Sequence, residues 1–401
     1  MTARVTEPTW RPLARRLADR LTAEGDLRTP QWRAALLAVP RHEFVPRYYL
    51  QDTSTRPARW IAHEPHDPAG VARWLELVYS PTTLITEVVD DSERGVQVPV
   101  CSSTKPDLMI RMLEALQLSA GMRVLEIGTG TGYNAGLMAH RLGDRNVYSV
   151  DIDPALVTAA RHRLAGLGYR PTLAAGDGAD GLADHAPFDR IIATCALRAI
   201  PPAWIDQLRP GGLVLAHLEG PLGAGNLVAL RRGERPVVQG KFLPWWGCFM
   251  RRRTTTGPTS GSHRPTPTTQ QATTRPSTLD PAELDGGFRF LAQLHLPADT
   301  FRSIRLADDD HTPMTYLLAP DGSWVEVARH ADACGHYTVR EAGPTPLWTA
   351  VESAWTEWNH LGTPPWHDFG ITATPNEHRI WHSDPAGPTW TLPTPTRRPA
   401  W

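Results

Sequence analysis

Three glycines at alternate positions, Gly128, Gly130 and Gly132, separate a short apolar run from a segment of helical character. The apolar run 124–127 predicts a buried strand, and residues 133–142 predict a helix. Because glycine has no side chain, the backbone at such a turn can bend sharply and come close to a ligand. The first amides of the following helix would point into the turn. We therefore expect this turn to hold a polar or anionic part of a nucleotide-like ligand.

Acidic residues accompany the strands expected around this turn. Glu126 lies on the first strand, and Asp151 follows the second apolar run, 146–150, where a carboxylate suits a ribose diol. Asp177 follows a third run, 172–175. This pattern is typical of S-adenosylmethionine-dependent methyltransferases. A nucleotide-dependent dehydrogenase would more often carry G-x-G-x-x-G, which is absent here, and an α/β domain with an idle glycine turn is the remaining alternative.

An α/β sheet is needed to position these residues. Apolar runs at 188–193 and 208–218 predict two further strands, and residues 220–253 could supply the last ones. Leucines at helical spacing in 13–21 predict an N-terminal amphipathic helix. Residues 48–91 are irregular in pattern, apart from a possible helix at 68–78 and a possible strand or hairpin at 79–89. The fold class predicted is α/β, a Rossmann-like methyltransferase sheet with N-terminal helices.

A second chemical feature is the run of hydroxyl residues Ser102, Ser103 and Thr104 before a helix that begins at Pro106. Hydroxyl side chains in this position commonly cap the helix.

In combination, the motifs VPRHEFVP (39–46), EIGTGTG (126–132) and AGDG (175–178) resemble the protein-L-isoaspartate O-methyltransferase family, from about residue 13 to residue 228. The resemblance implies S-adenosyl-L-methionine as cofactor, with its methionine end over the glycines, its ribose on Asp151 and its adenine near Asp177. The cofactor-binding residues implied are Glu126, Gly128, Thr129, Gly130, Gly132, Asp151, Ile152, Asp177 and Gly178.

The same resemblance implies where the substrate binds. The family has a serine two residues before a proline that faces the reacting carboxylate, and here Thr104 takes that position, so the hydroxyl is kept. Ser103 beside it is the second catalytic candidate. Lys105 could hold the carboxylate by charge or point to solvent. Thr194 would lie at the carboxyl end of its strand, and Arg198 could grip the substrate by bidentate pairing or be a surface arginine.

Other candidate groups have simpler interpretations. His42 and Glu43 could be catalytic. The favoured interpretation is that they are a helix cap and a salt-bridge pair that packs the N-terminal helical hairpin on the sheet. Cys195 is expected to be a packing residue, because methyl transfer from a sulfonium needs no covalent enzyme intermediate. The four cysteines lack a C-x-x-C pair and the C-terminal histidines lack metal-ligand spacing, so we assign no metal.

Composition excludes several classes of partner. The formal net charge of the 401 residues is −1, so no nucleic-acid or membrane surface is expected. No apolar run is long enough to span a bilayer, and no apolar core follows the arginine-rich N-terminus as it would in a secretory signal. We expect a cytoplasmic protein.

The length allows two domains of ordinary size. We expect a catalytic domain at 1–253, a flexible linker at 254–280, where apolar residues are almost absent, and a small C-terminal α+β domain at 281–401 for substrate recognition. Ten of the fifteen tryptophans lie from Trp245 onward, and most are expected to be core residues, although a peptide-binding surface is the alternative.

With a long C-terminal extension after the family domain, the chain resembles the peptide aspartyl methyltransferases of ribosomal-peptide (lanthipeptide and graspetide) pathways. The function predicted is methylation of a side-chain carboxylate of aspartate or isoaspartate in a peptide or protein, with a modified precursor peptide as the substrate and aspartimide or isoaspartate as the product. A general L-isoaspartyl repair enzyme, a non-catalytic S-adenosylmethionine-binding scaffold and a small-molecule carboxyl methyltransferase are the alternatives.

Overall fold

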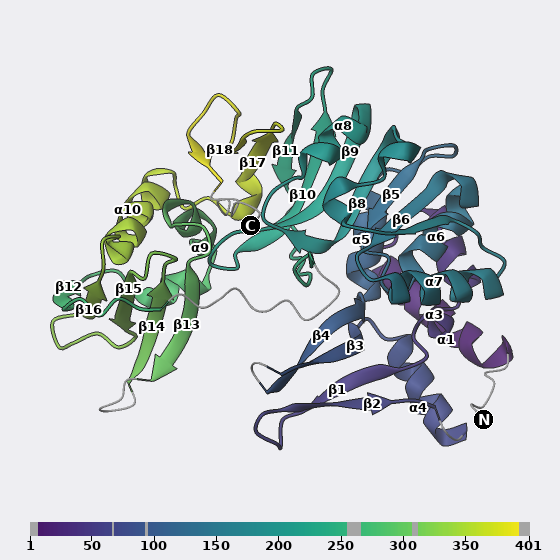
Figure 1. Cartoon of the computed structure of the whole chain (residues 1–401), viewed down its shortest axis with the longest axis horizontal. Coiled ribbons are helices and arrows are strands. Elements are labelled where there is room, and N and C mark those ends of the chain that lie inside the picture. Colours follow the sequence, from purple (N-terminus) through teal and green to yellow (C-terminus); the bar gives the residue numbers. More distant parts are fainter. Residues whose placement is uncertain (1–6, 66–67, 93–94, 255–265, 307–311, 393–401) are drawn as a thin grey trace.

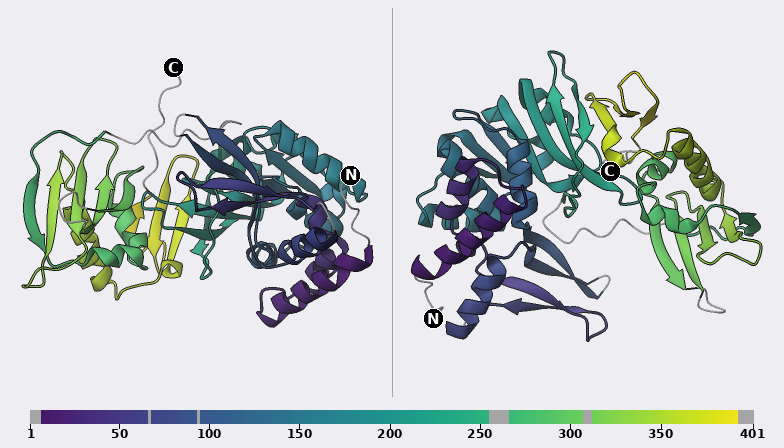
Figure 2. Two further views of the ribbon diagram at one scale, coloured as in Figure 1. Left: turned by 90° about the horizontal axis from the view of Figure 1, so that it is seen from below. Right: turned by 180° about the vertical axis from the view of Figure 1, so that it is seen from behind.

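The computed structural model describes residues 7–65, 68–92, 95–254, 266–306 and 312–392. Within these ranges the strands form three sheets, of ten, four and five strands (Figure 1). The ten-stranded main sheet lies in the middle of the molecule, with the four-stranded sheet below it and the five-stranded sheet at the end opposite the N-terminal helices (Figures 1 and 2).

The main sheet has the order β19-β18-β17-β11-β10-β9-β8-β5-β6-β7. Its parallel part runs from β7 to β9, as fully buried apolar runs predict. The strands of this part are β5 (Val124–Ile127), β6 (Val147–Asp151), β7 (Thr172–Ala175), β8 (Phe188–Leu197) and β9 (Leu208–Glu219). The antiparallel strands β10 (Gly225–Arg232) and β11 (Val238–Phe242) continue it. The predicted α/β, Rossmann-like fold class is confirmed.

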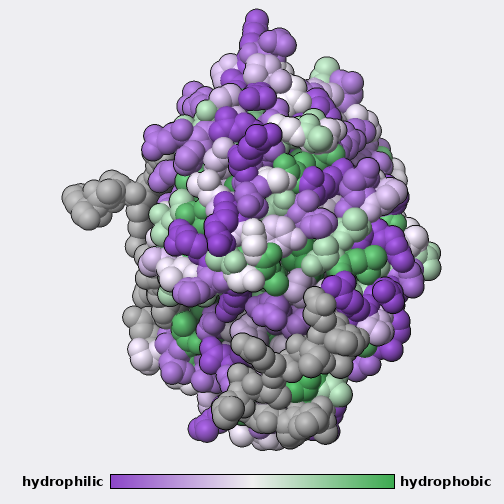
Figure 3. All heavy atoms as spheres, turned by 90° about the vertical axis from the view of Figure 1, so that its right-hand side faces the viewer, coloured by the Kyte–Doolittle hydropathy of each residue, from purple (hydrophilic) through white to green (hydrophobic). Residues whose placement is uncertain are grey.

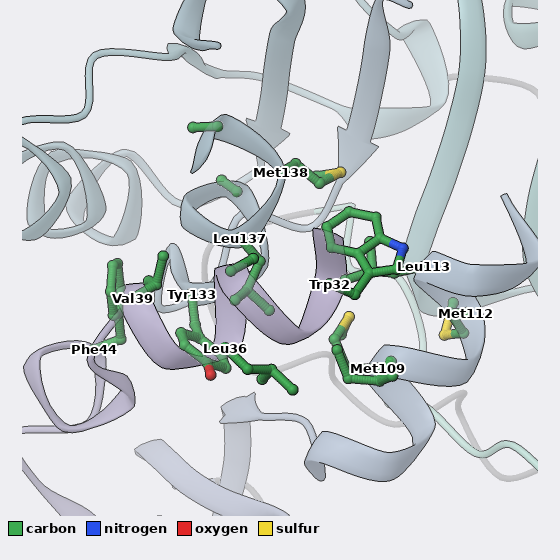
Figure 4. Packing of buried hydrophobic residues seen from close by; sticks show 14 of the residues in the cluster. Trp32, Leu36, Val39, Phe44, Met109, Met112, Leu113, Tyr133, Leu137 and Met138 are labelled. Atoms are coloured by element: carbon green, nitrogen blue, oxygen red, sulfur yellow. The ribbon is translucent and has the colours of Figure 1, made fainter. Parts of the chain in front are cut away.

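Alternate residues of the central parallel strands enter different cores. Val124 packs in one core and Leu125 in the other, as the two-residue period of a strand requires. The first core is covered by the N-terminal helices and by α5–α7, and Figure 4 shows Trp32 there beside Met109 and Leu113. The helices are α1 (Glu7–Ala23), α2 (Pro30–Ala38), α3 (Arg41–Phe44), α5 (Pro106–Ala115), α6 (Tyr133–Leu142) and α7 (Pro154–Gly166). On the second core lie α8 (Pro202–Gln207) and α9 (Arg289–Ala292).

The four-stranded sheet is antiparallel, in the order β2-β1-β3-β4. Its elements are β1 (Tyr48–Asp52), β2 (Arg59–His63), α4 (Pro68–Val78), β3 (Leu84–Asp91) and β4 (Val96–Ser103). The hairpin of β1 and β2 lies in a region that we predicted to be irregular. Both strands are largely exposed, so neither carries the apolar alternation that marks a half-buried strand.

The five-stranded sheet is antiparallel, in the order β12-β16-β15-β14-β13, and α10 packs on it. Its elements are β12 (Thr273–Ser277), β13 (Phe301–Leu306), β14 (Pro313–Leu318), β15 (Trp324–Ala328), β16 (Tyr337–Ala342) and α10 (Leu347–His360). β12 falls inside the expected linker 254–280 and pairs with β16, so that part of the linker prediction is wrong. As an edge strand, β12 has mostly exposed, polar side chains, so its sequence lacks the apolar pattern that would predict a strand. Residues 255–265 of the expected linker lie outside the described residues.

The last strands return to the main sheet. β17 (Phe369–Ala373) pairs with β11, and β18 (His378–His382) and β19 (Thr389–Thr391) follow it at the edge. The region 281–401 thus contributes to two sheets. The domain boundaries at 253 and 281 stay a prediction. Strands from both sides of them, β11 and β17, pair in one sheet.

The surface is mixed in character. The face in Figure 3 is hydrophilic over most of its area, with small hydrophobic groups between. Among the described residues, no helix combines the length and the apolar character needed to cross a membrane.

Candidate active site

A cavity lies at the carboxyl ends of β5, β6 and β8, where open α/β sheets bind ligands. Its lining comes mainly from the glycine turn after β5, residues 100–104 at the end of β4, residues 150–152 at the end of β6, the end of β8, and residues 250–253. It holds about 910 Å³ of space between atoms, its open mouth included, which is within the range of ligand pockets.

The glycine turn requires glycine for both conformation and space. Gly128 has φ +98°, and a Cβ there would lie 2.7 Å from the hydroxyl oxygen of Thr194. Gly130 has φ +48° and lines the cavity. Gly132, with φ +89°, begins α6, and a Cβ on it would lie 2.9 Å from the Cβ of Ala160 on α7. Gly132 therefore allows two helices to pack, while Gly128, Thr129 and Gly130 form the cavity wall.

Glu126 is the most buried acidic group at the cavity, with no exposed surface. Its carboxylate accepts hydrogen bonds from the Asn134 amide and from the Ser149 hydroxyl, both at 2.6 Å. Burial raises the pKa of Glu126 to about 7, and these two hydrogen bonds act in the opposite direction. Both oxygens are thus engaged in supporting β5, β6 and α6.

Asp151 closes the next part of the wall, followed by Ile152. One carboxylate oxygen of Asp151 accepts the Gly130 amide at 2.8 Å, and the other accepts the Asp153 amide at 3.1 Å. Burial raises the pKa of this carboxyl. The side chain thus ties the end of β6 to the glycine turn while facing the cavity.

Asp177 lies at the end of β7 and caps a short helical turn by accepting the Ala179 amide at 2.8 Å. It also forms an ion pair with Arg252, which lines the cavity. Gly178 lines the cavity too, and its carbonyl accepts the indole N–H of Trp204 at 2.8 Å. Asp177 is not among the residues that line the cavity, but its ion pair holds Arg252 there.

Ser103 and Thr104 line the same cavity as the glycine turn. Both are fixed by Arg41, whose guanidinium is fully buried and donates to the Ser103 hydroxyl at 3.3 Å and to the Thr104 carbonyl at 3.2 Å. The same group donates to the carbonyls of Val78 and Thr82. Burial lowers the pKa of Arg41 to about 10. Arg41 was missed from sequence, although it lies in the motif VPRHEFVP.

Of the three predicted substrate-binding residues, one lines the cavity and two do not. Thr194 lines the cavity, with its hydroxyl 2.9 Å from the Gly128 carbonyl. Lys105 forms an ion pair with Asp107 at 2.8 Å, and Arg198 forms one with Asp299 at 3.0 Å. Neither Lys105 nor Arg198 is among the residues that line the cavity.

Residues 250–253 were also missed. Ala196 donates its amide to the Met250 carbonyl at 2.8 Å, and Arg252 donates its amide to the Ala196 carbonyl at 2.9 Å. These bonds hold Arg251, Arg252 and Arg253 beside the end of β8. The available signal was three consecutive arginines in a chain of nearly balanced charge.

Two other potentially reactive side chains, His42 and Cys195, are in buried surroundings that disfavour their charged forms. His42 packs among aromatic rings, with Nδ1 2.9 Å from the Tyr79 hydroxyl, and burial lowers its pKa to about 4. Cys195 lines the cavity, but burial raises the pKa of its thiol to about 12, which disfavours the nucleophilic thiolate. Across the described part of the chain, no group of three or more His, Cys, Asp or Glu residues is arranged to hold a metal ion.

Comparison with known proteins identifies the family. A family model described as protein-L-isoaspartate(D-aspartate) O-methyltransferase matches residues 77–235. The protein-L-isoaspartate O-methyltransferase of Pyrobaculum islandicum is 32% identical over 240 residues, which cover 58% of this chain and 98% of that relative. This chain belongs to the protein-L-isoaspartate O-methyltransferase family. The protein-L-isoaspartate O-methyltransferase of Xanthobacter autotrophicus is 40% identical over 184 residues, which cover 44% of this chain and 83% of that relative.

The fold likeness extends further than the sequence likeness. A solved protein-L-isoaspartate O-methyltransferase matches with a TM-score of 0.53 and 23% identity, covering 92% of this chain and all of that one. As a member of this family, the chain is an S-adenosyl-L-methionine-dependent methyltransferase. The predictions of family, enzyme class and cofactor are confirmed.

Proposed function

We propose that this methyltransferase acts on a side-chain carboxylate of aspartate or isoaspartate within a peptide or protein. The observation that carries the proposal is the cavity itself. It brings together a glycine turn suited to the methyl donor, the hydroxyl pair Ser103–Thr104, and three consecutive arginines suited to an anionic substrate.

The residues of the cavity fit S-adenosyl-L-methionine. Gly128 and Gly130 leave open the space that side chains would fill, and the Asp151 carboxylate suits a ribose diol. Thr129, Ile152 and Gly178 complete this side, with Glu126, Gly132 and Asp177 in support. When bound, the cofactor supplies a methyl group activated by a sulfonium centre.

The chain would contribute orientation and charge. A substrate carboxylate is ionised at neutral pH, so no general base is needed to activate it. The Thr104 hydroxyl, next to Ser103, would donate a hydrogen bond that aims the carboxylate. Arg252 and Arg253 would favour its entry by charge, and exclusion of water inside the cavity would strengthen these contacts.

The finer proposal is that the substrate is a modified precursor peptide. The backbone nitrogen of the residue after the methylated aspartate would attack the ester carbonyl and release methanol, which leaves an aspartimide that water can open to isoaspartate. The region 281–401, proposed as the recognition domain, supports this finer proposal, because the Pyrobaculum relative matches only 58% of this chain. General isoaspartyl repair is the second candidate, favoured by the family and by the fold likeness that covers 92% of the chain.

Intact-mass spectrometry tests the proposal. The full chain and S-adenosylmethionine are incubated separately with a short isoaspartyl peptide and with a cyclised precursor peptide. A methyl gain on the isoaspartyl peptide supports repair, and a methyl gain or water loss confined to the cyclised peptide supports the finer proposal. If neither mass changes, the proposal is overturned in favour of a scaffold or a small-molecule carboxyl methyltransferase.

A further inference from the structure

A second cavity lies between the start of β10 and residues 285–290, outside the active site. It holds about 750 Å³ of space between atoms, its open side included. Trp246 and Trp366 complete its lining, and we call it the tryptophan cavity. Among the described residues, none lines both this cavity and the active-site cavity.

The walls of the tryptophan cavity are largely aromatic. Trp246 is 52% exposed, and its ring lies edge-to-face with that of Trp366, with the ring centroids 6.1 Å apart. The Trp366 indole N–H donates to the Leu243 carbonyl at 2.9 Å, which fixes the orientation of this ring. Phe290 and Arg289 line the cavity beside them. An inserted aromatic ring could pack against these ring edges and faces and interact with the guanidinium through its π face, which an aliphatic side chain cannot do.

An extended segment joins the tryptophan cavity to the active-site cavity. Trp246 lines the first of these cavities and Met250 lines the second. Trp246, Cys248 and Met250 are exposed. Gly247 is buried, and Phe249 packs against the first core of the main sheet. This two-residue alternation is that of an extended chain, so three exposed side chains of low polarity form a row between the two cavities.

We propose that the peptide substrate lies along the segment from Trp246 to Met250 and places an aromatic side chain in the tryptophan cavity, four residues from its aspartate or isoaspartate. This inference rests on the proposed function and adds a specificity determinant to it. Four residues of extended chain span at most about 14 Å, so a substrate strand alongside the segment covers the distance with the same number of residues. The reacting carboxylate then enters the active-site cavity beside Met250.

Four isoaspartyl peptides with one common centre test the specificity. The first has alanine at the fourth residue on both sides of the isoaspartate. Two others carry tryptophan at the fourth residue before or after it, and the last carries leucine in place of the favoured tryptophan. We expect kcat/KM for one tryptophan peptide to exceed that for the alanine peptide by at least about tenfold in the wild type, with a clearly smaller gain for leucine.

Variants of exposed apolar residues show whether the tryptophan cavity causes this preference. Trp246→Ala should abolish it, because the most exposed aromatic wall of the cavity is removed. Ile61→Ala is the matched control and should keep the full preference, since Ile61 is 46% exposed on β2 and lines neither cavity. Thermal unfolding checks that the variants are folded, and Trp246→Leu, which keeps apolar bulk without the ring, replaces Trp246→Ala if it is not.

Protection of Cys248 from alkylation is a second readout that needs no methyl transfer. Cys248 and Cys334 are both exposed thiols, but Cys334 lies in the loop between β15 and β16, away from the proposed path. The full chain is treated with iodoacetamide in the presence of S-adenosylhomocysteine and the favoured tryptophan peptide. At a peptide concentration about ten times the dissociation constant, alkylation of Cys248 should slow roughly tenfold, while that of Cys334 should not change.

The two readouts separate this inference from the proposed function. If the wild type methylates none of the four peptides, the result counts against the proposed function, and protection of Cys248 still decides whether an aromatic peptide binds along the segment. Unchanged alkylation of Cys248 overturns the inference. The aromatic assignment is also overturned if the alanine or leucine peptide is methylated as efficiently as the tryptophan peptides, or if Trp246→Ala keeps the preference.

Discussion

The guanidinium of Arg41 donates to the hydroxyl of Ser103 at 3.3 Å, although the two residues belong to separate parts of the chain. Arg41 comes from the helical segment before the four-stranded sheet, and Ser103 ends the last strand of that sheet. The hydroxyl wall of the cavity is thus positioned by a buried cation that does not line the cavity itself.

Replacing Arg41 should affect both stability and rate. Arg41→Met leaves several buried carbonyls without donors, so we expect the free energy of unfolding to fall by about 3 kcal/mol, with slower methyl transfer. Urea unfolding measures the first effect. Arg33→Met, which removes only an exposed ion pair with Asp19, is the control and should change stability by no more than about 0.5 kcal/mol. Equal losses in both variants would show that Arg41 has no special positioning role.

Thr104 should matter through its hydroxyl. We expect Thr104→Ala to lower kcat for carboxyl methylation by roughly tenfold to a hundredfold, because a donor aimed at the substrate is lost. Thr104→Ser should retain most of the rate. Binding of S-adenosylhomocysteine, measured by calorimetry, should be unchanged in both variants. An alanine variant as fast as the serine variant would exclude the role.

Gly128 and Gly143 form a matched pair for the cofactor site. Both have positive φ, but a Cβ on Gly143 meets no atom within 4 Å, while one on Gly128 would lie 2.7 Å from the Thr194 hydroxyl oxygen. Gly128→Ala should therefore weaken S-adenosylhomocysteine binding by at least about tenfold. Gly143→Ala should cost about 1 kcal/mol of stability and leave the binding constant unchanged. Tight binding by Gly128→Ala would contradict the assigned site.

Glu126 should give stability a pH dependence. Its pKa is raised from 4.5 to about 7 on folding, so the folded state favours the protonated carboxyl. The resulting contribution is full below pH 4.5 and is lost as the pH rises through 7. We expect the stability of wild type relative to Glu126→Gln to fall over this window in urea titrations. Parallel curves for the two proteins would contradict a raised pKa.

A chain that ends at residue 253 should fold poorly. It would lose β17, which pairs with β11, and the aromatic side chains of Phe290 and Phe369, which pack in the second core of the main sheet. We expect aggregation, or a broad thermal transition in circular dichroism. A soluble fragment with the unfolding midpoint of the full chain would instead support an independent catalytic domain at 1–253.

Local patterns predicted the centre of the fold well. The strand, glycine turn and helix at 124–142 carry their information in a single continuous segment. The cavity wall formed by residues 250–253 depends on pairing with Ala196 and on Asp177, which neither local propensity nor spacing reveals. The return of β17 to β11 is likewise a long-range pairing that has no signal in either strand alone.

The five-stranded sheet is encoded between two strands that are neighbours in the main sheet, β11 and β17. Its own first and last strands, β12 and β16, are also neighbours, so the chain enters and leaves this unit at the same side. During synthesis the main sheet must remain open at β11 until this unit and α10 have been made. Folding of the five-stranded sheet first would shorten the effective loop that β17 must close, and so lower the entropic cost of completing the main sheet.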